Sequence, residues 1–104
     1  MKKQIGNGNK ELDDLLKRFE SKKMKDTEFL AELLLLFKTK PVITSLLYSL
    51  LTRSERKTIA ARVLIVKMLK ANIPQHKISE KLKVGVATVT RGASEIQKGR
   101  FDFM

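Results

Sequence analysis

The part of this chain that decides its fold is residues 74–97, with the sequence PQHKISEKLKVGVATVTRGASEIQ. Ile78 and Leu82 stand four residues apart, so a helix would place both side chains on one buried face. Val89 and Ile96 stand seven residues apart and would share the buried face of a second helix. The spacing therefore predicts two short helices, one directly after the other.

A tight turn is predicted between these helices, because residues 83–85 interrupt the apolar spacing. Gly85 can supply the left-handed backbone that a sharp turn needs. Pro74 suits the first position of the first helix, where its missing N–H loses no hydrogen bond. The second helix is predicted to start near Val86.

The outward positions of the second helix are small or hydrogen-bonding, where a solvated helix would carry Lys and Glu. Small residues let a helix approach base edges closely, and Thr offers both a methyl group and a hydroxyl. This pattern is typical of a helix-turn-helix whose second helix enters a DNA groove. The predicted DNA contacts are Gln75, His76, Lys77, Lys81, Val86, Ala87, Thr88, Thr90, Arg91 and Lys98. Those on the first helix are equally compatible with ordinary solvated surface, because phosphate contacts look the same in a sequence.

The charge of the chain supports a polyanionic partner. The net charge is +11, and residues 53–104 carry twelve basic and four acidic side chains. Most of the positive excess therefore lies in the same half as the predicted helix-turn-helix. Such a balance favours nucleic acid or an anionic membrane surface.

Several classes of site are not expected. The chain has no Cys and a single histidine, His76, so neither a disulfide scaffold nor a metal site is predicted. No apolar segment follows Lys2 and Lys3, so we expect no signal peptide. The longest apolar run, residues 33–37, is too short to span a bilayer. The predicted location is cytoplasmic.

The whole chain is predicted to be all-α, because strand signals are poor. A disordered tail is expected over residues 1–9, followed by a single helical domain over residues 10–104. Four helices are expected ahead of the helix-turn-helix, over residues 11–20, 27–38, 41–51 and 53–71. Asp26 is the expected N-cap of the second of these. The sequence TRSE, from Thr52 to Glu55, has the spacing of a capping box that starts the fourth.

Two of these helices are too apolar to face water alone. Residues 29–37 are nearly all apolar apart from Glu32, and residues 64–68 add a second apolar side to the fourth helix. Because a chain of 104 residues offers little to cover them, a partner subunit is expected to do so. The prediction is a homodimer with a core of residues 27–71 and reading heads of residues 74–98.

The second half of the chain resembles the Trp repressor family. The resemblance rests on LLTxxER at residues 50–56, AxRVxIV at residues 60–66 and VGVATVTRG at residues 84–92. It implies an intertwined homodimer that binds double-stranded operator DNA in successive major grooves. It also implies a corepressor, L-tryptophan or a related amino acid, lodged between each head and the core.

The resemblance also implies which residues hold that ligand. Arg62 and Arg91 would sandwich the indole, and Arg91 would also bind the carboxylate. Gly92 would allow the ring to approach the backbone closely. Residues from Ser49 to Leu51 would offer carbonyl groups to the ammonium, with Thr52 nearby.

The chain departs from the family at Glu95, where the tryptophan-binding members have Ser. Glu95 stands four residues after Arg91, so the two could pair along the helix and fill the pocket. Alternatively, its carboxylate could accept a hydrogen bond from a ligand ammonium. The spacing from Arg62 to the reading head is also one residue shorter than in the tryptophan-binding members. The family has a further C-terminal helix, whereas this chain stops at Met104.

The predicted function is a sequence-specific, DNA-binding transcriptional repressor controlled by an amino-acid corepressor, with tryptophan as the first candidate. One alternative is a constitutive DNA-binding protein with no small-molecule ligand. A second is a basic protein–protein adaptor, although an adaptor has no need of a small-residue reading face. An enzyme is not expected, because the sequence shows no nucleophile–base set, no paired carboxylates in an apolar context and no phosphate loop.

Overall fold

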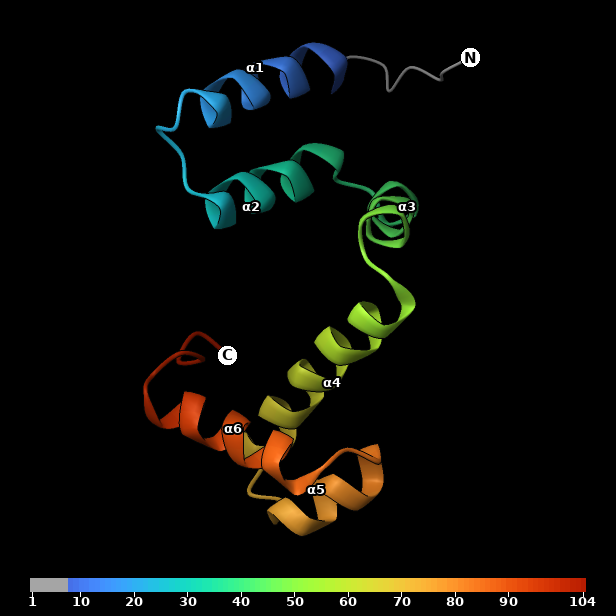
Figure 1. Cartoon of the computed structure of the whole chain (residues 1–104), viewed down its shortest axis with the longest axis vertical. Coiled ribbons are helices and arrows are strands. Elements are labelled where there is room, and N and C mark those ends of the chain that lie inside the picture. Colours follow the sequence, from blue (N-terminus) through green and yellow to red (C-terminus); the bar gives the residue numbers. More distant parts are fainter. Residues whose placement is uncertain (1–7) are drawn as a thin grey trace. The chain divides into compact units, whose positions relative to one another are not determined.

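A computed structural model describes residues 8–104, and all the regular structure in that range is helical (Figure 1). This confirms the all-α prediction. The helices are α1 (Gly8–Glu20), α2 (Asp26–Phe37), α3 (Lys40–Leu50), α4 (Arg53–Lys70), α5 (Gln75–Leu82) and α6 (Val86–Gln97). The tail predicted over residues 1–9 falls mainly on residues outside the described range, and α1 already begins at Gly8.

The described chain divides into two compact units, residues 8–50 and residues 51–104. The boundary falls inside the stretch 27–71 that we expected to form one core. The first unit contains α1, α2 and α3, and the second contains α4, α5 and α6.

In the first unit, α1 packs against α2. The rings of Phe19 and Phe29 stack with their centroids 4.4 Å apart. Arg18 Nη1 pairs with Glu32 Oε1 at 3.1 Å. One side of α2 is thereby covered, yet Leu35 on the same helix remains 73% exposed.

The N-cap prediction for α2 was wrong by one residue. Lys25 is the N-cap, in an extended conformation and without a side-chain cap bond, and Asp26 is the first helical residue. The carboxylate of Asp26 then lies in the first turn, where the positive end of the helix dipole favours an anion.

The capping box at the start of α4 is confirmed. Thr52 Oγ1 accepts a hydrogen bond from the Glu55 backbone N–H at 3.1 Å, and Glu55 Oε1 accepts one from the Thr52 N–H at 2.8 Å. Two N–H groups that have no partner inside the helix are satisfied in this way. The cap fixes where the long helix α4 begins.

The core of the second unit brings α4, α5 and α6 together. Ile65 of α4, Ile78 of α5 and Val89 of α6 are 2%, 0% and 0% exposed. The partly buried side chains packed around them are Met68, Leu69, Ile73, Leu82 and Val84. The short helices α5 and α6 thus owe their arrangement to packing against α4 rather than to their own length.

The turn between α5 and α6 differs from the prediction at Gly85. Gly85 has φ −69° and is the N-cap of α6, whereas Lys83 adopts the left-handed conformation with φ 57°. Two hydrogen bonds hold the turn at Lys83: Val84 N–H donates to the Ser79 carbonyl (3.2 Å), and Ser79 Oγ donates to the Val84 carbonyl (2.6 Å). These bonds offset the cost of a left-handed backbone at a residue other than glycine.

Gly92 sets how closely α6 approaches α4. A Cβ atom at this position would lie 2.9 Å from Ile65 Cγ2 and 3.5 Å from Leu69 Cδ1. Real Cβ contacts are essentially never that short, and the buried Ile65 has little room to move. The absence of a side chain at Gly92 is therefore a packing requirement of the second unit.

We expect Gly92→Ala to lower the free energy of unfolding by about 1–3 kcal/mol, since it overpacks the contact between α6 and Ile65. Gly85→Ala is the matched control, because its Cβ would meet nothing within 4 Å and its φ is ordinary. That control should change stability by less than about 0.5 kcal/mol. Urea unfolding of both variants measures the difference, and equal losses would contradict the role given to Gly92.

Candidate ligand pocket and nucleic-acid interface

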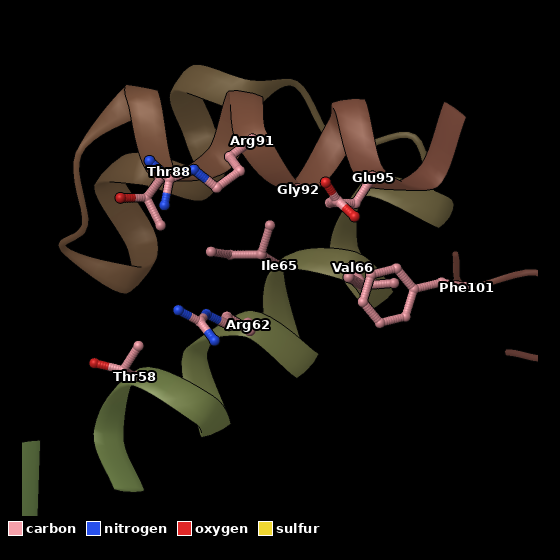
Figure 2. A pocket seen from close by; sticks show the side chains of 9 residues that line it. All are labelled: Thr58, Arg62, Ile65, Val66, Thr88, Arg91, Gly92, Glu95 and Phe101. Atoms are coloured by element: carbon pink, nitrogen blue, oxygen red, sulfur yellow. The ribbon is translucent and has the colours of Figure 1, made fainter. Parts of the chain in front are cut away.

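A pocket of about 420 Å³ lies in the second unit, between α4 and α6 (Figure 2). Pockets that hold small molecules are commonly about 300–1,000 Å³. The residues that line it are Thr58, Arg62, Ile65, Val66, Thr88, Arg91, Gly92, Glu95 and Phe101.

The floor of the pocket is apolar and its rim carries two cations. Ile65 and Val66 are each 2% exposed and form the floor from α4. Arg62 comes from α4 and Arg91 from α6, so the two facing helices contribute one guanidinium each (Figure 2). Within residues 8–104, neither guanidinium has an ion-pair or hydrogen-bond partner. The arrangement suits a ligand with a flat apolar body and an anionic group.

Glu95 does not pair with Arg91 in the described structure. Its carboxylate lies 3.6 Å from Lys98 Nζ and 3.4 Å from Arg100 Nη1. Both cations follow Glu95 in the chain, at the end of α6 and just beyond it. The pairing with Arg91 that we considered as a way to fill the pocket is therefore not formed, and Arg91 keeps its charge available.

The structure brings together only some of the residues that the resemblance placed at the ligand. Arg62, Arg91, Gly92 and Glu95 line the pocket. Leu51 lines a smaller neighbouring cavity of about 290 Å³, which shares Thr58 and Arg62 with the pocket.

The other three predicted ligand residues have local partners. The Leu51 carbonyl accepts a hydrogen bond from Arg56 Nη1 at 2.8 Å. Thr52 caps α4. Ser49 belongs to the unit of residues 8–50, where its hydroxyl donates to the Ser45 carbonyl at 2.8 Å.

Four residues that line the pocket were not predicted as ligand residues from the sequence, and a fifth, Thr88, was predicted only as a DNA contact. Thr58 precedes Arg62 by one helical turn, a spacing that could have identified it. Ile65 and Val66 carried only a core signal, because a buried floor and a buried core look alike in a sequence. Phe101 lies beyond the last periodic segment and gave no signal. Thr88, predicted at DNA, also lines the pocket.

The predicted DNA contacts on α6 form an exposed face. Val86, Ala87, Thr88, Thr90 and Arg91 are all exposed, whereas Val89 between them is fully buried. The buried Val89 anchors α6 to the core, and of the exposed residues Thr88 and Arg91 also line the pocket. This separation leaves a face of small and hydroxyl-bearing side chains open to a partner.

A side-chain hydrogen bond joins helix α5 to this face of α6. Thr90 Oγ1 donates a hydrogen bond to Gln75 Oε1 at 2.8 Å, so the two side chains lie together. His76, Lys77 and Lys81 are exposed on α5, whereas Lys98 at the end of α6 pairs with Glu95. No helix within residues 8–104 is both long and apolar enough to cross a membrane.

Residues 25–104 match the family described as Trp repressor protein. The match begins one residue before α2, so α1 lies outside it. Among curated proteins, the chain is similar to a Trp operon repressor homolog of Vibrio campbellii, with 45% identity over 53 residues, or 50% of this chain and 53% of that protein. It is also similar to a Trp operon repressor homolog of Aliivibrio salmonicida, with 46% identity over 54 residues, or 51% of this chain and 50% of that protein.

A Trp operon repressor homolog of Vibrio cholerae shows 45% identity over 53 residues, or 50% of this chain and 52% of that protein. The chain therefore spans about half the length of the curated relatives it matches. No solved structure gives a significant match.

Proposed function

This chain belongs to the Trp repressor family, and we propose that it is a dimeric, sequence-specific, DNA-binding transcriptional repressor controlled by tryptophan or a related amino acid. The proposal of DNA binding rests on the exposed face of α6. Its residues are mostly small or hydroxyl-bearing, and the buried Val89 fixes the helix to the core. A helix of this composition can approach base edges in a major groove.

The positive charge supplies affinity for the DNA backbone. Residues 53–104 carry twelve basic and four acidic side chains, and the lysines of α5, Lys77 and Lys81, are exposed. Contacts from lysine and arginine to phosphates position a protein on DNA, while contacts to base edges give specificity. Lys77 and Lys81 are assigned to the first role and Thr90 to the second.

The dimer is proposed because helices α2 and α4 each carry exposed apolar side chains within the described residues. Leu30, Leu34 and Leu35 of α2 are exposed, as are Ile59, Val63 and Leu64 of α4. Full burial of an exposed side chain of this kind stabilises by roughly 1.5–3 kcal/mol, and these partly exposed side chains would each gain a fraction of that on association. A second copy of the chain carries the same apolar surfaces and could cover them mutually. The resemblance to the Trp repressor family implies such a homodimer, with intertwined subunits.

If the folded chain requires its partner, its melting temperature should rise with protein concentration, by mass action. A dilution series followed by circular dichroism measures this. Sedimentation equilibrium at the same concentrations gives the oligomeric state. A monomer with unchanged helix content at low micromolar concentration would contradict the dimer.

DNA affinity should fall steeply with salt, by about 10³–10⁵ between 50 and 200 mM if six to ten phosphates are contacted. Lys81→Ala should weaken binding to all sequences alike and lower the salt slope by about 1. Thr90→Ala should relax sequence preference instead. Binding to a panel of operator variants at several salt concentrations separates the two effects. Unchanged discrimination in Thr90→Ala would show that α6 is not the reading helix.

Control by a ligand is proposed from the geometry of the pocket. Arg62 on α4 and Arg91 on α6 stand on opposite walls, so a ligand bound by both would fix α6 relative to α4. DNA affinity then rises only by as much as the ligand prefers the DNA-competent arrangement, typically about 5–150-fold. By linkage, operator DNA tightens ligand binding by the same factor.

Titration calorimetry with L-tryptophan tests this control. Arg62→Ala should abolish the ligand response while leaving ligand-free DNA binding nearly unchanged. Arg91→Ala should weaken both, because Arg91 is exposed on α6 as well as lining the pocket. Arg53→Ala, at the start of α4 and outside the pocket, is the control for lost charge. If titration with tryptophan and with other amino acids gives no heat of binding, the alternative of a constitutive DNA-binding repressor is favoured.

A further inference from the structure

The chain beyond α6 turns back toward the pocket because of Gly99. Helix α6 ends in a Schellman motif: Arg100 N–H donates to the Glu95 carbonyl (3.1 Å), and Gly99 N–H donates to the Ile96 carbonyl (2.9 Å). Gly99 has φ +81°, a conformation that favours glycine. The reversal places Phe101 among the residues that line the pocket.

Side-chain contacts hold this segment on both helices of the pocket. The Glu95 carboxylate on α6 pairs with Arg100 and Lys98, at 3.4 Å and 3.6 Å. Lys70, the last residue of α4, donates a hydrogen bond from Nζ to the Phe101 carbonyl. The segment is therefore tied to α6 through the side chain of Arg100 and to α4 through the backbone carbonyl of Phe101.

The ring of Phe101 closes one end of the pocket. Figure 2 shows it beside Val66 and below Glu95, with Arg62 and Arg91 on the other side of Ile65. A cavity of about 420 Å³ remains with the ring in this place, which is room for an amino-acid-sized ligand. The ring thus acts as a wall and does not fill the site.

We propose that residues 98–104 form a strap over the pocket, in which Phe101 contacts the aromatic body of the ligand. In this proposal Glu95 is a positioning residue: it holds the strap through Arg100 and Lys98 instead of binding a ligand ammonium. The ligand-contacting role of Phe101 rests on the proposed corepressor control, whereas the strap itself does not. Glu95 then has a local role, since it anchors a wall of the pocket.

The strap can be tested without any ligand, because the chain contains no tryptophan. Phe101→Trp introduces a single indole, and acrylamide quenching reports how well it is shielded. We expect much weaker quenching than in Phe103→Trp, since Phe103 is 82% exposed. Equal quenching of the two would overturn the strap.

The role of Glu95 is tested in the Phe101→Trp background. Glu95→Gln or Arg100→Gln should raise quenching toward that of free N-acetyltryptophanamide, whereas Arg100→Lys keeps a cation and should retain the shielding. Glu80→Gln, on the exposed side of α5, is the matched control for a lost carboxylate. Circular dichroism checks that each variant keeps its helix content. Unchanged shielding in Glu95→Gln would overturn the positioning role.

Calorimetry with L-tryptophan tests the wall. Phe101→Ala should weaken binding by about 2- to 12-fold, the range expected for one lost aromatic contact. Glu80→Gln should leave the affinity unchanged, because Glu80 lies outside the pocket. Tighter binding in Phe101→Ala would mean that the ring occupies the ligand's own place and would overturn the wall. If the parent protein gives no heat of binding, both corepressor control and the contact of Phe101 with the ligand are contradicted. The quenching experiment still decides whether residues 98–104 lie over the pocket as a strap.

Discussion

The arrangement of the second unit depends on the close approach of α6 to α4 at Gly92. A Cβ there would stand 2.9 Å from Ile65 Cγ2, so the two helices can meet only where one of them has no side chain. This contact buries Ile65 and Val89 together with Ile78, and it sets the depth of the pocket beside it. The same contact fixes the orientation of α6, and with it the direction in which its exposed face points.

Most of the helical framework could be predicted from the sequence, because its signals are local. The capping box at Thr52 and the apolar spacing of α5 and α6 each depend on residues within one or two turns. The errors arose where two local solutions compete. Gly85 was the natural residue for a left-handed turn, yet the hydrogen bonds of Ser79 to Val84 placed that conformation at Lys83. Asp26 is equally suited to a cap and to a first helical turn, and the structure uses the second.

The pocket could be predicted only in part, for a different reason. Arg62, Arg91 and Gly92 were identified through motifs shared with a family and Glu95 as a departure from that family, and the structure brings these four together. Phe101 could not be found in this way, because its position depends on the reversal at Gly99 and on a contact with Lys70, which stands far from it in the chain. The partners of Glu95 were missed for the same reason: helical spacing pointed to Arg91, whereas the chain beyond the helix end supplied Lys98 and Arg100.

Ile65 serves the fold and the pocket with one side chain. It is 2% exposed within the core of α4, α5 and α6, and it also forms part of the pocket floor. A substitution there that reshaped the pocket for a different molecule would also leave a void or a clash in the core, at a cost of about 1–3 kcal/mol out of a small total stability. A change in the molecules that the pocket can admit is therefore confined to its rim, where Thr58, Glu95 and Phe101 lie outside the core of the three helices.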